Sequence, residues 1–338
     1  MSIICKDFGS CDGKSVEQYT LIGNGGLEAD ILTYGATVRA LRFSGVDTVC
    51  GYDDLDGYIN GKSYQGASVG RYGNRIANAE FTLGGTKYTL DRNNNKACLH
   101  GGNSGFSHRM WEVCSAGGDE PSVKLYFHSD DGEGGFPGNL DEYVTYTVTD
   151  SNEFLIKYEA VSDKDTVFNP TCHAYFNPSG TGETALDVFL TVNADEFTAV
   201  NSELIPTENR AVNMTPFDFR RGKRVGCDLV AKYDQIELVK GYDHNFILNG
   251  KEPAATLFSD KTGIAIECYT TEPGIQVYTA TNLDEPCGKG GKPLRRFDAV
   301  CLETQHFPNS PNRPDFPSTV LYAGEHFESE TVYRFIKK

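Results

Sequence analysis

The sequence predicts an all-β protein: a large antiparallel β-sandwich with very little helix, occupying residues 1–338 as a single domain. Short runs in which polar and apolar residues alternate, rich in Val, Thr, Tyr and Phe, recur along the whole chain. The 36 glycines and many Asn and Asp residues fall between these runs as turn signals. No composition break or low-complexity linker marks a boundary, so we expect one sandwich rather than two smaller β domains.

The individual strands follow from the alternation. Gly84 and Gly85 predict a hairpin over residues 81–90, because glycine tolerates the positive φ angles of a two-residue turn. The other expected strands are Val123–Phe127, Tyr143–Val148, Phe154–Ala160, Ala185–Val192, Gly263–Tyr269 and Gly274–Tyr278. Helical periodicity is weak and limited to two candidate segments, Leu55–Ile59 and Cys227–Tyr233.

The charge of the chain argues against several kinds of partner. A net charge of −16 opposes binding to nucleic acid and to anionic lipid surfaces through long-range repulsion. The basic cluster at residues 220–224 is therefore expected to be a solvated turn. No stretch approaches the roughly 20 apolar residues that span a bilayer. We expect neither a nucleic-acid partner nor a membrane.

The cysteines indicate the compartment. The ten cysteines are irregularly spaced and include no Cys-x-x-Cys pair, which leaves a zinc or thioredoxin-like motif unsupported. Residues 1–7 lack the apolar run of a signal peptide. We therefore expect a cytoplasmic protein with reduced thiols.

The most informative segment runs from residue 301 to residue 317. It opens as an apolar strand, and prolines at 308, 311 and 314 then exclude both helix and sheet ladder. Glu303 is expected where the strand ends and an ordered loop begins, a position at which rigid scaffolds place functional side chains. Taken alone, Glu303 is also compatible with an ion-paired carboxylate at a sheet edge.

The segment Asn169–Asn177 is the sharpest local signal. His173 alternates with Tyr175 and Asn177, so that on a strand all three would share one face. Such a face is typical of a polar cleft with an aromatic floor. A histidine with a purely structural role fits this segment equally well.

Two segments in the first third of the chain carry polar chemistry. Asn74 and Arg75 lie in a stretch rich in Gly and Asn, and the planar Arg fork grips vicinal hydroxyls or a carboxylate. Arg71, four residues earlier, is expected to form a structural salt bridge. His100 stands before a flexible glycine loop, where backbone can approach a ligand closely, although a turn residue would look the same.

Two later segments add candidates. Asp243 lies in a polar turn that leads into a strand, where it serves either a ligand or the turn itself. Gln276 and Tyr278 share one face of the next expected strand. The Gln side chain offers both a donor and an acceptor, as sugar hydroxyls require, but it is equally compatible with an ordinary sheet face.

Taken together and in chain order, the segments resemble those of the aldose 1-epimerases, also called galactose mutarotases. The matching pieces are Gly70–Ile76, Leu99–Phe106, Asp131–Leu140, Asn169–Asn177, Tyr242–Leu248, Glu272–Thr279 and Leu302–Pro317. They cover almost the whole chain, and those around His173 and Glu303 are the most specific. The chain departs from the family pattern at Cys172, where Asn is usual, and at Pro178, where Leu or Ile is usual.

The resemblance implies a β-sandwich with a sugar cleft on its concave face. It implies that Glu303 is the catalytic base and His173 the catalytic acid. The substrate-binding positions it implies are Asn74, Arg75, His100, Asp243 and Gln276, with Tyr175 lining the pocket. The expected substrate is a free aldose such as galactose or glucose, and the expected state is a monomer or weak homodimer.

The chemistry of anomer interconversion agrees with these residue types. A proton leaves the C1 hydroxyl and another reaches the ring oxygen O5, and both oxygens are attached to one carbon. A carboxylate and an imidazolium on either side of that carbon are sufficient, so we expect no cofactor and no metal. The carboxylate of Glu303 is expected to favour the protonated form of His173 near neutral pH.

Three other functions remain open at this level. A glycoside hydrolase would need two carboxylates, such as Asp243 and Glu303, but would leave His173 without a role. A carbohydrate-binding protein on the same fold would not need an acid and a base. A sugar-phosphate epimerase would need clustered Lys and Arg, and the matched segments offer chiefly Arg71 and Arg75.

Overall fold

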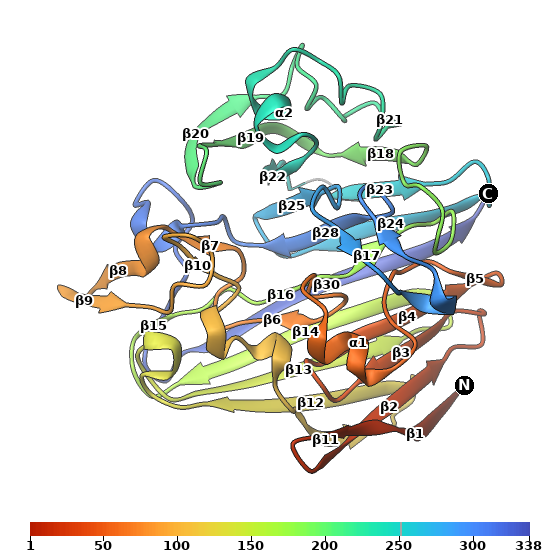
Figure 1. Ribbon diagram of the computed structural model, residues 1–338. Coiled ribbons are helices and arrows are strands. Elements are labelled where there is room, and N and C mark those ends of the chain that lie inside the picture. Colours follow the sequence, from red (N-terminus) through yellow and green to blue (C-terminus); the bar gives the residue numbers. More distant parts are fainter. Residues whose placement is uncertain (251) are drawn as a thin grey trace.

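The computed structural model describes residues 1–250 and 252–338, whose strands form three large antiparallel sheets and five two-stranded ones (Figure 1). The nine-stranded sheet has the order β11 (Glu112–Ala116), β12 (Ser122–Ser129), β13 (Leu140–Val148), β14 (Glu153–Ser162), β30 (His326–Lys337), β24 (Ile264–Thr270), β23 (Ala255–Phe258), β18 (Phe189–Val192) and β21 (Lys223–Arg224). The six-stranded sheet has the order β17 (Tyr175–Phe176), β28 (Val300–Gln305), β25 (Gly274–Tyr278), β22 (Asp243–Leu248), β19 (Ala194–Val200) and β20 (Pro206–Ala211). The five-stranded sheet has the order β1 (Ser2–Cys11), β2 (Lys14–Ile22), β3 (Glu28–Leu32), β4 (Thr37–Phe43) and β5 (Val46–Asp47).

The remaining elements are short. The two-stranded sheets pair β7 (Arg75–Ile76) with β10 (Cys98–Leu99), β8 (Glu80–Leu83) with β9 (Thr86–Thr89), β6 (Ser68–Val69) with β16 (Thr171–Cys172), β15 (Thr166–Val167) with β29 (Val320–Leu321), and β26 (Asp284–Glu285) with β27 (Leu294–Arg295). Within the described residues, α-helix is limited to α1 (Leu55–Asn60) and α2 (Asp234–Val239). The 3₁₀ turns are Ala77–Ala79, Gly102–Ser104, Phe106–His108, Glu133–Gly135, Lys289–Gly291 and Ser310–Asn312. The predicted all-β sandwich with very little helix is confirmed.

Most of the expected strands are present, but two of the expected segments are wrong. The hairpin forms as β8 and β9, and β13 and β14 show strict alternation of buried and partly exposed residues. Residues 185–188 form a turn instead of a strand, since Val188 N–H donates to the carbonyl of Ala185. Residues 227–230 form turns, residues 231–233 have no regular structure, and helix α2 begins only at Asp234. Asp234 and Glu237 lie in its first turn, where negative charge suits the helix dipole.

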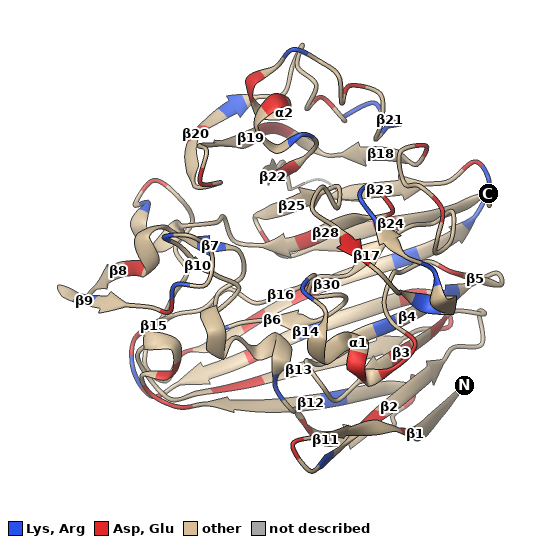
Figure 2. Cartoon of the chain, viewed as in Figure 1, with Lys and Arg blue, Asp and Glu red and all other residues tan. Residues whose placement is uncertain are grey.

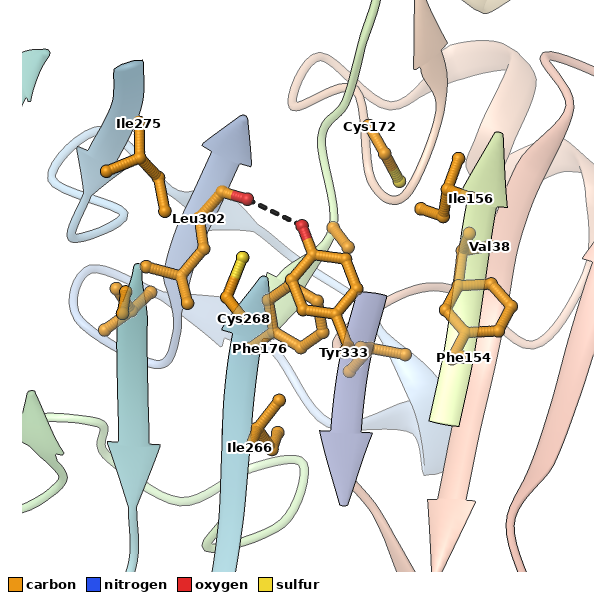
Figure 3. Close-up of a cluster of buried hydrophobic side chains, with 14 of the residues drawn as sticks. Val38, Phe154, Ile156, Cys172, Phe176, Ile266, Cys268, Ile275, Leu302 and Tyr333 are labelled. Carbon is orange, nitrogen blue, oxygen red and sulfur yellow. Dashed lines mark hydrogen bonds between the residues drawn. The ribbon is translucent and has the colours of Figure 1, made fainter. Parts of the chain in front are cut away.

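The main core receives side chains from all three large sheets. Its residues extend from Tyr19 to Phe335, with contributions from β13, β14, β24, β28 and β30. Figure 3 shows Leu302 of β28 and Ile275 of β25 in this core together with Cys268 and Tyr333. Both the N-terminal and the C-terminal parts of the chain contribute to this main core, and two smaller clusters of buried residues accompany it.

The expected turn at residues 220–224 is only partly correct, because residues 220 and 221 lie in a turn whereas Lys223 and Arg224 form strand β21. Acidic residues are spread over the strands and loops of the chain (Figure 2). The ion pairs of this basic segment are Arg220–Asp195, Arg220–Asp218, Lys223–Asp228, Arg224–Asp187 and Arg224–Asp260. Their positive charge is therefore locally balanced. In the described part of the chain, no helix has the length and apolar character needed to cross a membrane.

Candidate active site

Strand β28 positions Glu303 on the face of the sheet that is turned away from the main core. All residues of this strand are buried, so its two faces are distinguished by their partners. Leu302 packs into the core, and its carbonyl accepts a hydrogen bond of 2.8 Å from the Tyr333 hydroxyl (Figure 3). Neighbouring side chains on a strand point to opposite faces, so Glu303 points the other way. The expectation that the strand ends at Glu303 is wrong, because pairing with β25 continues to Gln305.

His173 lies in the short connection between β16 and β17. Its backbone N–H donates to the carbonyl of Ala67, and its carbonyl accepts from Gly66 N–H. The imidazole stacks on the ring of Tyr175, with centroids 5.0 Å apart and an interplanar angle of 20°. Asn177 does not lie beside His173 and Tyr175, so the expectation that all three share one face is wrong. Its amide donates to the carbonyls of Glu183 and Asp298, because β17 ends one residue earlier and the chain turns away.

The two side chains meet in one cavity, to which distant parts of the chain contribute. The Nε2 atom of His173 lies 3.8 Å from the Oε2 atom of Glu303, and both side chains are at least 94% buried. Oε2 has no hydrogen-bond partner among the described residues. The cavity has a volume of about 250 Å³. Asn74, Arg75, His100, Tyr175 and Asp243 also line it.

Burial reverses the usual order of the two pKa values. Burial, and secondarily the charge of Asp243, raises the pKa of Glu303 well above its ordinary value. Burial lowers the pKa of His173 to about 4. The expectation that Glu303 keeps His173 protonated is therefore wrong, because burial of the imidazole is the largest influence on its pKa and disfavours the charged form. The directions of the two shifts favour a protonated carboxyl group beside a neutral imidazole.

His100 faces the same cavity as a hydrogen-bond donor. Its Nδ1 accepts the backbone N–H of Asn74 over 3.2 Å, and its own backbone N–H donates to the carbonyl of Asn74. Because burial lowers its pKa well below the ordinary value, the neutral ring carries its proton on Nε2. Gly101 follows with φ of +83°, and a Cβ there would lie 2.0 Å from the carbonyl oxygen of Gly70.

The same three side chains also form a possible metal group. The candidate ligand atoms of His100, His173 and Glu303 lie within 4.8 Å of one another. A metal-bound histidine normally donates its second ring N–H to an acceptor. The second nitrogen of His100 instead accepts the N–H of Asn74, so its hydrogen bonding suits a hydroxyl group better than a metal ion.

The predicted binding residues form two polar groups, one around Arg75 and one around Asp243. Arg75 Nε donates to Asn94 Oδ1, and no carboxylate pairs with the guanidinium among the described residues, which leaves donors free for a ligand. Gln276 Nε2 donates to Asp243 Oδ1 over 2.7 Å. Gln276 stands opposite Glu303 in the register of β25 and β28, yet it supports Asp243 instead of lining the cavity.

Sequence reasoning missed one aromatic residue of the site. Tyr64 lines the cavity, and its ring lies 4.9 Å from that of His100 and 6.1 Å from that of His173. Its φ of +52° is unusual for a residue with a side chain. The segment shows no periodicity that would have marked it. Further residues that line the cavity are Lys62, Ser63, Asn94, Leu99, Tyr278, Asn282, Leu283, Asp284 and Glu285.

Three notable residues stay outside the cavity. The buried guanidinium of Arg71 donates to the carbonyls of Pro137 and Gly138, a structural role in which carbonyls replace the expected salt-bridge partner. Cys172 belongs to the main core (Figure 3). The carbonyl of Pro178 accepts from Thr262. Neither departure from the family pattern brings a side chain into contact with the reactive atoms of His173 or Glu303.

Comparisons with known proteins agree over nearly the whole chain. The family model described as aldose 1-epimerase matches residues 17–334. Galactose mutarotase of Bos taurus is 39% identical over 322 residues, 91% of each chain. Aldose 1-epimerase of Escherichia coli (strain K12) is 35% identical over 337 residues, 96% of each chain.

Solved structures give the same result. The crystal structure of galactose 1-epimerase from Lactobacillus acidophilus superposes with a TM-score of 0.91 at 30% identity and covers 99% of both chains. An aldose epimerase homologue from C. elegans superposes with a TM-score of 0.86 at 33% identity, covering 94% of this chain and 98% of that one. The chain therefore belongs to the aldose 1-epimerase family of isomerases.

Proposed function

We propose that the protein interconverts the α and β anomers of a free aldose such as galactose or glucose, with Glu303 as the base and His173 as the acid. The observation that carries this assignment is the 3.8 Å separation between Nε2 of His173 and the unpartnered Oε2 of Glu303 in one cavity. The relatives named galactose mutarotase and aldose 1-epimerase support the substrate class.

The reaction needs one proton transfer at each of two oxygens on C1. Glu303 takes the proton of the C1 hydroxyl while His173 gives a proton to O5, so the C1–O5 bond breaks and its electron pair goes to O5. A carbonyl forms at C1, which rotates and presents its other face. The two transfers then run in reverse and close the ring. Each positioned group contributes roughly 10²- to 10⁴-fold to the rate.

The protonation states of Glu303 and His173 are compatible with this cycle. A protonated Glu303 beside a neutral His173 carries the same number of protons as a carboxylate beside an imidazolium. The reactive form therefore arises by moving one proton within the pair, without uptake from solvent. Sugar hydroxyls that donate to the carboxylate favour its ionised form and promote this transfer.

The remaining polar groups hold the sugar. His100 Nε2–H and the free donors of Arg75 supply hydrogen bonds to oxygens, and Asp243 accepts them from hydroxyl groups. The ring of Tyr175 fixes the imidazole plane from one side. We also propose that the protein works without a cofactor, as a monomer or weak homodimer in the cytoplasm.

Polarimetry on freshly dissolved α-galactose tests the proposal. Glu303→Gln keeps the size of the side chain and removes the base, so we expect mutarotation to fall to the uncatalysed rate while calorimetric galactose binding persists. The reaction without enzyme is the control for spontaneous mutarotation. Wild-type speed in the Gln variant would show that the base lies elsewhere.

A panel of α-aldoses would rank the substrates, and the same experiments separate the other candidate functions. A glycoside hydrolase would release nitrophenol from an aryl glycoside. A carbohydrate-binding protein would bind galactose with no acceleration of mutarotation by the wild-type protein. The comparisons favour neither alternative.

A further inference from the structure

The thiol of Cys301 contacts the ring nitrogen of His173 that the proposed reaction leaves unused. Cys301 Sγ lies 3.6 Å from Nδ1, whereas Glu303 Oε2 lies 3.8 Å from Nε2. Both nitrogens of the proposed acid therefore face side chains of the same strand, β28. We propose that the sulfur of Cys301 accepts the Nδ1–H of His173 and holds the neutral ring in the tautomer whose Nε2 is free to take up a proton.

Strand geometry explains why one strand supplies both contacts. Residues 301 and 303 are two positions apart, so their side chains point to the same face. The residue between them, Leu302, is anchored to the core by the Tyr333 hydroxyl, which fixes the rotation of the strand (Figure 3). Tyr175 pairs with Cys301 across β17 and β28 and also stacks on the imidazole. The ring is thus held in its plane between thiol and carboxyl.

The proposed cycle requires this particular tautomer. When His173 gives its Nε2 proton to O5, the neutral ring that remains carries its proton on Nδ1. Nε2 must then stay free, because it takes the proton back when the ring of the sugar closes. A neutral ring protonated on Nε2 would present a donor in place of an acceptor and would stop the cycle. An acceptor beside Nδ1 disfavours that form.

A thiol suits this role better than a carboxylate. A carboxylate at Nδ1 would stabilise the imidazolium and make His173 a weaker acid. Sulfur is a weak acceptor, which orients the Nδ1–H with little effect on charge. Burial raises the pKa of Cys301 well above its ordinary value, so the sulfur remains an uncharged thiol. Among the described residues, Nδ1 of His173 is the one hydrogen-bond partner of this thiol.

Nitrogen-15 NMR of protein labelled in its histidines tests the tautomer in the wild-type protein. We expect neutral His173 to show a protonated Nδ1 and a bare Nε2. A protonated Nε2 in the wild-type protein would overturn the proposal, whatever any variant does. This measurement is independent of catalysis, so it tests the tautomer even if His173 is not the acid. The role of the tautomer in the reaction cycle rests on the proposed function.

Kinetics of two substitutions complete the test. Cys301→Ala removes the acceptor, and we expect kcat to fall about 3- to 10-fold with KM unchanged and both tautomers in the spectrum. Cys301→Ser restores an acceptor and should recover most of kcat. Cys268→Ala is the matched control, since Cys268 is a buried thiol in the main core without contact to the cavity. A wild-type kcat in Cys301→Ala, or an equal loss of kcat in the Ala and Ser variants, would show that Cys301 acts only through packing.

Discussion

The amide nitrogen of Gln276 donates to one oxygen of Asp243 over 2.7 Å, and Gln276 stands directly opposite Glu303 in the neighbouring strand. A proposed substrate-binding carboxylate is thus held by the residue beside the proposed base. This contact fixes the position of Asp243 relative to the reactive pair, and it ties sugar binding to the strands that carry the chemistry.

Removal of this contact should weaken binding more than catalysis. In Gln276→Ala the carboxylate loses a charge-assisted hydrogen bond, so we expect KM for galactose to rise about tenfold with a smaller change in kcat. Gln276→Glu is the matched variant, since it retains size but replaces the donor with an acceptor. A variant with normal KM and reduced kcat would instead place Gln276 in the reaction step.

The pH dependence of kcat/KM should follow the inverted pKa values. His173 and Glu303 together hold one proton in the pH range between the pKa of His173, about 4, and the raised pKa of Glu303. We therefore expect a bell whose acid limb lies near pH 4, well below the 6.5 of an ordinary histidine. Polarimetry across pH, corrected for the spontaneous reaction, measures both limbs.

Asp243→Asn provides an internal check on the alkaline limb. The charge of Asp243 contributes to the raised pKa of Glu303, so its removal should move this limb to lower pH while leaving the acid limb in place. An acid limb between pH 6 and 7 in the wild-type protein would contradict the assignment of the two groups.

Tyr64 should contribute to the sugar site through its ring alone. The ring contacts His100 and His173, and the hydroxyl makes no hydrogen bond to the described residues. We expect Tyr64→Ala to raise KM several-fold and to lower the free energy of unfolding by about 1–3 kcal/mol. Tyr64→Phe, which keeps the ring, should resemble the wild-type protein in steady-state kinetics and urea unfolding. A large effect in the Phe variant would reveal a role for the hydroxyl.

Acid should destabilise the fold through buried histidines outside the reactive pair. Burial lowers the pKa of His244 to about 3, whereas an unfolded histidine titrates near 6.5. As the pH falls, the unfolded chain therefore binds a proton at this histidine before the folded chain does. The stabilisation that depends on neutral His244 is complete above pH 6.5 and is lost as the pH falls toward 3. His244→Gln should reduce the loss of unfolding free energy between pH 7 and pH 4 by about 3 kcal/mol.

Urea unfolding of both proteins at several pH values measures this difference. Parallel curves of unfolding free energy against pH for the wild-type protein and His244→Gln would contradict the prediction. His326→Gln is the control, because it replaces an exposed histidine at the start of β30.

From the sequence alone, the fold class, several of the strands and the segments that build the site can be predicted. Alternation of period two and clustered turn residues are local properties, and they identify strands without knowledge of their partners. Motifs around His173 and Glu303 were recognisable for the same reason. Local patterns were weakest where an element depends on distant contacts, as in residues 185–188 and 227–233.

How these segments act on one another depends on packing between distant parts of the chain. The 3.8 Å approach of His173 to Glu303 arises because two distant segments pair in adjacent strands, β17 and β28. Their reversed pKa order follows from complete burial, which a charge count along the chain does not reveal. The contacts of Tyr64 and Cys301 with the same imidazole depend likewise on packing between segments, since neither residue lies near His173 in the sequence.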